Sequence, residues 1–581
     1  MAVYFNGRLW VTPATMSLVD DSQMANRNLS VGNVLAILGP SAGGKPWEPI
    51  TFGSYADAAK VLVSGEALKA IEKAFDPSSE TYGPSKIVFI RTNDETQSAL
   101  DLKDADGNAV INLVSTGYGR VNNSIRVLVK DGTKPGTKRL YTRFGTVVYQ
   151  GNNIARSCLS VQYVGSASSA TVTVSATQLI LKTGAVVAET FDFADIQTIQ
   201  ELSDRINAVD GFISLVLDNS GQLAAANRLD GVTNVPVKTT TAVALTGNLQ
   251  ACVDWFNSQS EPLVTATRAE GALKPPANTM STGTPSISTY VYLRGATDGL
   301  VTMNEWANAF EVLQGVDVQW VCPISSDPAI HAMTDSHCAY MSSIARMERR
   351  AICGTALGAS DDAGLSATKA LNSDRTSLVH LGMYDYDDTG KLTLFPPYIL
   401  AAQIAGMFSG VNPGTALTNK TLKIRGLERK LRNPTDTDDL IDGGMLCVED
   451  TPNGYKVVKS ITTWQVNDNY NRVEVSVGVA LDFVARNVRN VLDGLRGAKG
   501  TPQTIAEAIS RVDSALRELA RPEPMGPGVL AGDKANPPYR NITASLEGDV
   551  LRVEFECSPV IPINYIPIVI HAVPYSGSAS M

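Results

Sequence analysis

The sequence predicts an α/β core that is interrupted by a β-rich insertion, and three observations support this fold class. Short apolar runs alternate with segments of helical periodicity in residues 31–93, and the same alternation returns in residues 291–480. Between them, residues 94–290 are rich in Val, Thr, Ser and Gly, and apolar residues recur there at every second position. With 44% hydrophobic and 18% charged residues among 581, the composition is that of a folded protein with several domains.

Residues 1–30 are expected to form an N-terminal arm. Two short apolar runs flank Asn6-Gly7, a dipeptide typical of a tight β-hairpin turn. Polar residues follow these runs as far as Asn28. The apolar positions of the predicted hairpin include Val3, Phe5, Leu9 and Val11.

Residues 31–93 begin the core with a strand, a loop, a helix at Tyr55–Phe75 and a second strand at Lys86–Arg91. The loop GPSAGGKP, Gly39–Pro46, approaches the phosphate-binding pattern of a Gly, four residues, Gly-Lys and then Ser or Thr. However, Pro46 stands where the Mg²⁺-binding hydroxyl should be, and the next helix starts too late to face a phosphate. We interpret the loop as a turn, with a nucleotide-binding protein as the alternative.

Residues 94–290 are predicted to form one or two β-rich domains inserted into the core, with a single clear helix at Phe193–Val209. Residues 291–480 supply the main part of the core. Near its end, Arg472–Val479 has a two-residue apolar period, which predicts a strand.

Residues 481–560 predict a C-terminal domain with two helices and a final alternating strand. In residues 561–581, the run that follows is apolar on both faces, so a strand formed by it must be covered on both sides. Pro567 cannot donate a ladder hydrogen bond and suits an edge position. The strand either closes a sheet of its own subunit or pairs with another chain. Its apolar positions include Ile566, Ile568 and Ile570.

The charge balance argues against nucleic acid as a partner, because 49 basic residues face 58 acidic ones and the net charge is −9. No run approaches the roughly 18 apolar residues that cross a bilayer, so membrane insertion is not expected. The start MAVYFNGRLW has no charged lead before an apolar stretch, so no signal peptide is expected. Seven scattered cysteines, none at CxxC spacing, predict reduced thiols.

Neither a catalytic nor a metal site is predicted. Asp385–Gly390 matches the first half of a calcium loop, but Pro396 stands where a bidentate Glu is needed. His331 and His337 fall on different faces of one predicted helix. None of the four histidines lies in an HExxH motif or beside a GxSxG elbow. We therefore expect no enzyme activity and no cofactor.

A cationic cluster follows the core: Arg486, Arg489 and Arg496 share one face of a predicted helix, and Lys499 comes just after it. The charge pattern alone favours a solvated face near a helix C-terminus, where cations are stabilised by the helix dipole. The alternative is an electrostatic contact with an acidic partner.

Several segments share their pattern and their order with one family. They are Val34–Pro49, Thr51–Tyr55, Gly117–Val127 (GYGRVNNSIRV), Leu293–Gly299 (LRGATDG), Phe395–Val411, Leu422–Leu427 followed by Asp438–Gly444, and Val458–Trp464 (VKSITTW). Together they resemble the tail sheath proteins of contractile bacteriophage tails and related injection machines. Two departures are the intervening Arg120-Val121 and Ala296 in place of a second Gly. Residues 130–285 lie outside this resemblance.

The resemblance implies a structural subunit whose α/β core is subtilisin-like in architecture but not catalytic. Hexameric rings of the subunit would stack helically around the tail tube, and the sheath would contract to drive the tube through the host envelope. The partners would be the tube protein, with baseplate and tail terminator proteins at the ends. The protein would reside in the virion tail after assembly in the host cytoplasm.

Within such a sheath, residues 1–30 and 561–581 would be arms that link neighbouring subunits, and residues 94–290 would face outward. Residues 481–560 would face the tube. For the cationic cluster, the resemblance therefore favours contact with the tube over a solvated face. The tube-contacting residues would then be Arg486, Arg489, Arg496 and Lys499. Another virion protein, from a baseplate or a capsid, is the nearest alternative, and a secreted hydrolase is a more distant one.

Overall fold

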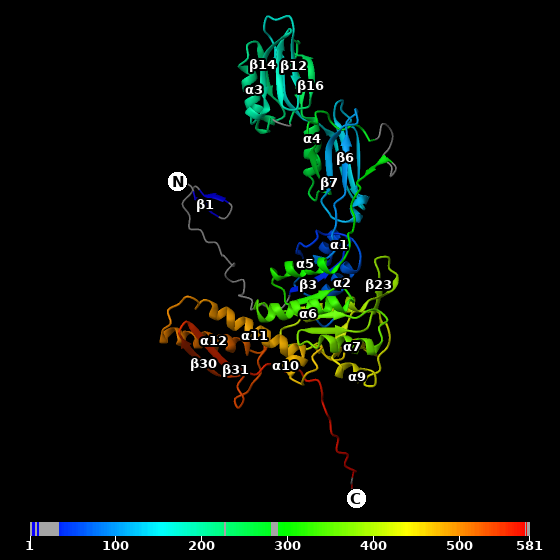
Figure 1. Cartoon of the computed structure of the whole chain (residues 1–581), viewed down its shortest axis with the longest axis vertical. Coiled ribbons are helices and arrows are strands. Elements are labelled where there is room, and N and C mark those ends of the chain that lie inside the picture. Colours follow the sequence, from blue (N-terminus) through cyan, green and yellow to red (C-terminus); the bar gives the residue numbers. More distant parts are fainter. Residues whose placement is uncertain are drawn as a thin grey trace.

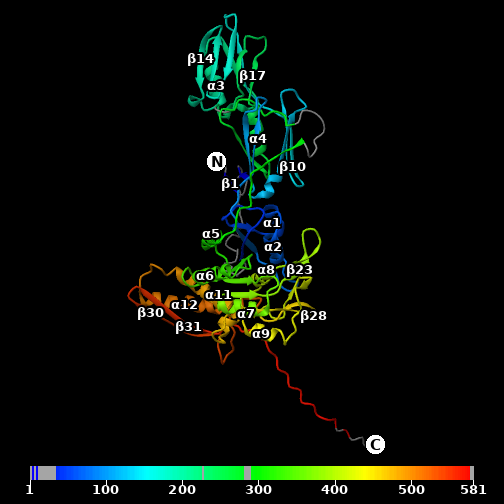
Figure 2. The same ribbon diagram turned by 45° about the vertical axis from the view of Figure 1, so that its right-hand side comes forward.

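A computed structural model describes residues 3–5, 8–10, 34–225, 228–279, 289–575 and 577. Figure 1 shows an elongated chain in which an α/β core carries a smaller domain at one side and two stacked β domains above it. The C-terminal segment leaves the core as a single extended chain, and it also stands clear of the core in the turned view of Figure 2.

The core is built on a seven-stranded sheet of order β27-β22-β21-β20-β3-β5-β4, parallel except for β4. Its strands are nearly continuous apolar runs, as expected for a sheet covered on both faces. Their bounds are β3 Val34–Gly39, β4 Ile50–Phe52, β5 Lys86–Arg91, β20 Trp320–Pro323, β21 Arg350–Gly354, β22 Thr376–Val379 and β27 Met445–Leu446.

Helices cover both faces of this sheet. One hydrophobic cluster packs α1 Tyr55–Leu62, α2 Glu66–Phe75 and α8 Pro397–Gly410 on one face. A second cluster packs α5 Met303–Gln314, α6 Pro328–Ser343, α7 Asp361–Leu371 and α9 Thr437–Asp442 on the other. The helix predicted over Tyr55–Phe75 is thus two helices. Two small sheets complete the core: β23 Met383–Tyr386, β24 Leu392–Phe395 and β26 Gly426–Leu427, and β25 Thr421–Leu422, β28 Val448–Thr451 and β29 Gly454–Val457.

The insertion forms two β domains. The inner domain has two sheets and one helix: β6 Ala99–Lys103, β7 Ala109–Ser115 and β18 Val264–Arg268; β8 Arg126–Asp131, β9 Lys138–Phe144, β10 Val147–Ile154 and β19 Val291–Tyr292; and α4 Asn248–Asn257. The outer domain has the same plan: β11 Ser157–Tyr163, β15 Phe212–Val216 and β17 Val243–Thr246; β12 Ala170–Val174, β13 Gln178–Thr183, β14 Val186–Asp192 and β16 Val232–Pro236; and α3 Ile199–Asn207.

A hydrogen-bonded neck joins the core to the inner domain, and the segments LRGATDG and GYGRVNNSIRV build it. The backbone N–H of Ala99 donates to the carbonyl oxygen of Arg294 at 2.8 Å. The Asn123 side chain exchanges two hydrogen bonds with the backbone of Ala296, at 2.9 and 3.0 Å. The insertion is therefore held by paired chains rather than by a loose linker.

The C-terminal domain consists of α10 Tyr470–Val473, α11 Val475–Asp493, α12 Pro502–Leu519 and the hairpin β30 Tyr539–Glu547 with β31 Val550–Cys557. The strand predicted over Arg472–Val479 is wrong, because α11 begins inside it. The first four residues of α11 are all buried. A helix turn that is buried on every side need not show helical periodicity, so its valines mimic a strand.

The two ends of the chain differ. β1 Val3–Phe5 and β2 Arg8–Trp10 pair as an antiparallel hairpin, as predicted, while Val11 lies outside the described residues. The predicted C-terminal strand is absent, because the described residues from Ile561 onward contain no strand or helix. None of the described helices is long and apolar enough to cross a membrane.

Candidate assembly interfaces

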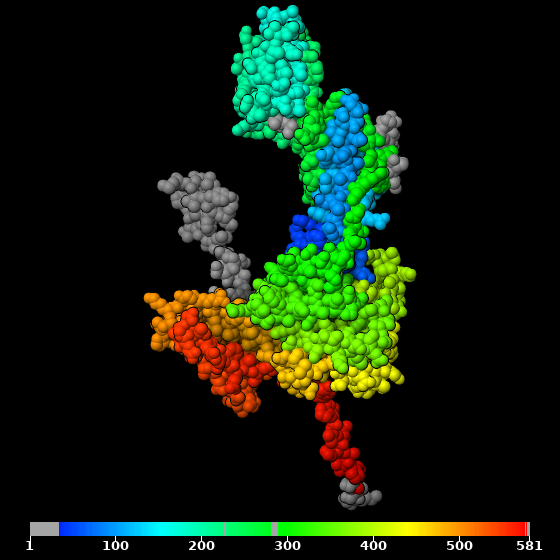
Figure 3. Space-filling model, in the orientation of Figure 1, coloured from blue at the N-terminus to red at the C-terminus, as the bar shows by residue number. Residues whose placement is uncertain are grey.

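The C-terminal segment is apolar and uncovered. Its last backbone hydrogen bond to the domain runs from the N–H of Val560 to the carbonyl oxygen of Val529, at 3.0 Å. Beyond it, Ile566, Ile568 and Ile570 are 76%, 77% and 84% exposed, and the segment stands free of the surface in Figure 3. An isolated chain gains nothing by exposing a continuous apolar run, so such a run marks an interaction site.

The N-terminal hairpin is likewise a separate sheet of only two strands. Its predicted linking residues Val3 and Phe5 lie in β1, and Leu9 lies in β2. Both ends of the chain thus carry short extended elements that belong to no larger sheet among the described residues.

The hairpin β30–β31 offers edges to which a strand can be added. One face of the hairpin packs on α12 through residues that include Tyr539 and Phe555. The other face is exposed and charged, with Arg552 and Glu554 on β31. Within the described residues this sheet has no third strand. Its outer backbone N–H and carbonyl groups can therefore pair with an extended chain.

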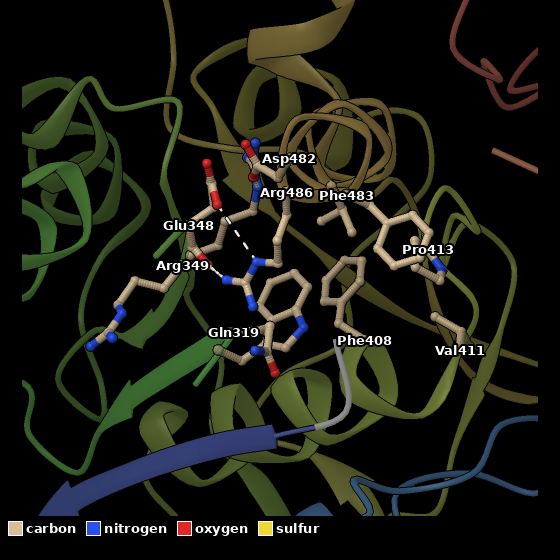
Figure 4. A pocket seen from close by; sticks show the side chains of 12 residues that line it. Gln319, Glu348, Arg349, Phe408, Val411, Pro413, Asp482, Phe483 and Arg486 are labelled. Carbon is tan, nitrogen blue, oxygen red and sulfur yellow. Dashed lines mark hydrogen bonds and ion pairs between the residues drawn. The ribbon is translucent and has the colours of Figure 1, made fainter. Parts of the chain in front are cut away.

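The four predicted tube-contacting residues divide into two pairs. In the first pair, Arg486 has a side chain that is 12% exposed, and it points at Glu348, as Figure 4 shows. Its guanidinium also lies 3.2 Å from a carboxylate oxygen of Asp317. Arg489 forms a close ion pair with the same Glu348. These two arginines attach α11 to the core, and the sequence could not reveal partners more than a hundred residues away.

A small cavity beside Arg486 marks this junction. It holds about 40 Å³, and its apolar wall includes the stacked rings of Trp320 and Phe408, 4.8 Å apart, and the ring of Phe483. That volume accommodates one or two waters and no larger ligand. The junction is therefore a packed contact between two domains.

In the second pair, both residues are exposed. Arg496 lies past the end of α11 at Asp493, and not on the helix as predicted; among the described residues its side chain pairs with Asp493, at 3.0 Å. Lys499 lies in the loop before α12. A groove of about 720 Å³ runs alongside, between the end of α11, the start of α12 and the tip of the β30–β31 hairpin. Its charged residues are Arg346, Arg489 and Arg496 together with Asp493 and Asp549, and its apolar residues include Leu492, Leu495, Ile505, Leu551 and Val553. Three arginines against two aspartates leave a small excess of positive charge, so this cationic groove suits an acidic surface with apolar side chains.

The glycine-rich loop at Gly39–Pro46 is built around a cation. The Arg91 guanidinium, which is fully buried, donates to the carbonyl oxygen of Gly44 at 3.0 Å and closely to that of Ser41. It also forms a close ion pair with buried Glu95. A phosphate site turns backbone N–H groups inward, whereas this loop turns carbonyl oxygens inward. The interpretation as a turn agrees with this geometry.

Two further groups of polar side chains lie elsewhere in the core. Asp387, in the calcium-like loop, accepts hydrogen bonds from Thr389 and Lys391 within the turn, and these bonds lower its pKa to about 2. His380 Nε2 lies 2.7 Å from Asp361 Oδ1, but the nearby Thr355 is buried and its hydroxyl donates to a backbone carbonyl. Among the described residues, no group of three or more His, Cys, Asp or Glu could hold a metal ion.

Comparisons with known proteins point in one direction. The tail sheath protein of Bacillus phage SP01 is 26% identical, over 99% of this chain and 98% of that protein. The putative tail sheath protein of Enterococcus phage phiEF24C is 26% identical, over 96% of each. A sheath tail protein of Listeria innocua shares the fold, with a TM-score of 0.54, 12% identity and coverage of 91% of this chain and 92% of that one. No family model matches the sequence.

Proposed function

We propose that the protein belongs to the phage tail sheath family and is a structural subunit of a contractile tail sheath. Similarity to tail sheath proteins over almost the whole chain supports this proposal. The observation that carries the proposal is the uncovered apolar segment after Val560. A subunit of a polymer needs such a segment to reach its neighbour, whereas a monomeric protein would bury it or lack it.

In this proposal the terminal segments are linking arms. The C-terminal arm adds a strand to the open edge of the β30–β31 hairpin of another copy, and the N-terminal hairpin element pairs in the same region. Main-chain hydrogen bonds then supply the affinity, so the linkage tolerates changes in angle between subunits. A contact of one surface with a different surface of the next copy is heterologous, and repeated copies form rings or open helical polymers.

The finer assembly in this proposal is the one that the resemblance to tail sheath proteins implies. Hexameric rings stack helically around a tail tube, and the sheath shortens to drive the tube through the host envelope. The cationic groove beside Arg496 and Lys499 faces the tube, where it meets an acidic surface. The two β domains of the insertion face outward, and baseplate and terminator proteins close the ends. The protein is a virion tail component assembled in the host cytoplasm.

The core in this proposal has a subtilisin-like architecture and performs no catalysis. A nucleotide-driven mechanism is disfavoured, because the glycine-rich loop surrounds Arg91 with carbonyl oxygens. Contraction would instead draw on two packed arrangements of the same rigid subunits, whose energy difference is set at assembly.

Electron microscopy of the purified protein, alone and with tube protein, tests the proposal. A sheath subunit forms hollow sleeves or stacked rings, and we expect these to lengthen in the presence of tube. Closed shells or flat plates would favour the capsid or baseplate alternatives. Monodisperse globular particles at every concentration and salt condition would contradict the proposal.

A further inference from the structure

The root of the C-terminal arm is held by one side chain. The carbonyl oxygen of the Asn564 side chain accepts a hydrogen bond from the hydroxyl of Thr418 at 3.1 Å. Its amide group donates to Glu474 Oε2 at 3.3 Å. Both the oxygen and the nitrogen of the Asn564 side chain are therefore hydrogen-bonded to the body of its own subunit. Asn564 lies four residues after the last backbone hydrogen bond of the arm.

The residues on either side of Asn564 are exposed. Ile563 is 80% exposed and Tyr565 is 77% exposed, although the Tyr565 ring lies near the ammonium group of Lys459, 5.7 Å away. From Ile566 to Tyr575 no hydrogen bond is formed with any described residue. Asn564 is thus the last point at which hydrogen bonds fix the arm.

The acceptor of this contact is unusual, because Glu474 is a carboxyl group that is only 2% exposed. It occupies the residue before the first turn of α11, and its other oxygen lies 3.4 Å from the hydroxyl of Ser476. Burying a carboxylate is costly unless hydrogen-bond donors replace the water it loses. The Asn564 amide is one of those donors, so the body of the subunit benefits from holding the arm root in place.

We propose that Asn564 is the pivot of the C-terminal arm, clasped by Thr418 and Glu474, so that the arm changes direction beyond residue 564 while its root stays fixed. The inference deepens the proposed function, since a fixed root is useful only if the arm links subunits. When a sleeve shortens, the arm that joins two subunits must bend, and the pivot places this bend just after residue 564. The point of departure stays constant in the long and short states, and only the distal residues reorient.

Distance measurements between two spin labels on the soluble subunit test the pivot without reference to assembly. The background variant is Cys557→Ser, because the other cysteines are buried. One label goes on Asn453→Cys, in the exposed turn between β28 and β29, and the other on Ile566→Cys, two residues past the clasp. We expect a narrow distance distribution for this pair. A second pair, Asn453→Cys with Val573→Cys, should give a broad one.

Substitutions at the clasp test whether it causes the expected difference between the 453–566 and 453–573 distance distributions. Asn564→Ala lies on the arm and removes no apolar packing from the core, and it should broaden the 453–566 distribution to resemble the 453–573 one. Ile563→Ala, at the exposed neighbour, is the matched control and should leave it narrow. Glu474→Gln keeps an oxygen acceptor and should also leave it narrow, whereas Glu474→Ala should broaden it. A broad 453–566 distribution in the starting protein, or a narrow one in Asn564→Ala, would overturn the pivot.

Assembly of the same variants then tests the role of the arm separately. If Asn564→Ala releases the root and sleeves become irregular or fail to form, the pivot and the linking arm both stand. If the root is released but sleeves of normal length and order form, the pivot stands as a structural feature and the linking role of the arm fails.

Discussion

The guanidinium of Arg91 lies 3.0 Å from the carbonyl oxygen of Gly44, at the centre of a loop whose sequence approaches a phosphate-binding motif. The loop closes around a positive charge of its own chain. A phosphate in the same place would face carbonyl oxygens, which repel it. Burial lowers the pKa of this guanidinium to about 9, so it remains charged at neutral pH beside Glu95.

This geometry makes opposite predictions for two cations of the loop region. The ammonium group of Lys45 is exposed and forms a surface ion pair with Glu48, so Lys45→Ala should change the free energy of unfolding by less than about 1 kcal/mol. Arg91→Leu leaves Glu95 buried without its partner and should cost about 3–5 kcal/mol. Chemical denaturation measures both, with Lys45→Ala as the control. ATP binding that requires Mg²⁺ and is lost in Lys45→Ala would contradict the turn.

The two pairs of cations in the C-terminal domain should respond differently to charge reversal. Arg486→Glu with Arg489→Glu places acids against Glu348, so the C-terminal domain should detach from the core and the melting temperature should fall. Arg496→Glu with Lys499→Glu should leave the melting temperature unchanged, because both side chains are exposed and the ion pair of Arg496 is with adjacent Asp493.

Copolymerisation with tube protein completes this test. Arg496→Glu with Lys499→Glu should weaken tube binding, and raised salt should weaken it in the unaltered protein. If tube binding is unaltered after this charge reversal, Arg496 and Lys499 form a solvated face and do not contact the tube.

Glu474 should make the stability of the subunit depend on pH. Burial raises its pKa to about 7, so between about pH 4.5 and 7 the folded state binds more protons than the unfolded state. Stability from this group is therefore present at low pH and lost as the pH rises through 7. Glu474→Gln removes the cost of ionisation and should stabilise the protein at pH 8 by up to about 3 kcal/mol. The melting temperatures should converge near pH 4.5, and a constant difference across pH would disprove this origin.

Removal of either arm should abolish assembly without unfolding the subunit. Deleting residues 1–12, or 562–581, removes no strand of the core sheet and no helix. Each truncated protein should keep its melting temperature within a few degrees and its circular dichroism, and it should remain soluble as single subunits. Sleeves of normal length from either truncation would refute the linking role of that end.

The outer β domain should be removable as a unit. Its two connections lie side by side, because the N–H of Gly247 donates to the carbonyl oxygen of Arg156 at 2.9 Å. Replacing residues 157–246 by a short Gly-Ser turn should leave the core and the inner domain folded and able to form sleeves. Deleting residues 130–285, as the sequence alone suggests, would instead cut through β8 and remove α4, and serves as the contrasting variant. A core that fails to fold after the first deletion would show that the outer domain is integral.

The sequence predicted the α/β core and the inserted β region, because buried parallel strands such as Val34–Gly39 and half-buried strands such as Ala170–Val174 leave clear patterns. It failed at the start of α11, where burial on all sides erases the helical period. It also predicted a strand around Ile568 that the structure lacks. The run is suited to a strand, but it has no partner strand among the described residues of its own subunit.

The candidate sites were less predictable, since their geometry depends on distant residues. The face shared by Arg486 and Arg489 follows from helical spacing, but their partner Glu348 lies on another part of the chain. In the same way, the lack of a hydroxyl at Pro46 disfavoured nucleotide binding, while the cation at Arg91 that fills the loop could not be foreseen. The clasp of Asn564 on Glu474 left no pattern in the sequence at all.

The helix α11, Val475–Asp493, connects the root of the arm to the cationic groove. Glu474, which grips the arm root, lies at one end, and the cationic groove begins at the other, about 28 Å away at 1.5 Å per residue. Between these two ends, Asp482 forms ion pairs with Arg350 and Arg375 of the core, at 2.9 and 2.7 Å. These ion pairs hold the middle of α11 on the core. We therefore expect a pull on the arm to turn the whole subunit, and the groove at the far end of α11 to turn with it.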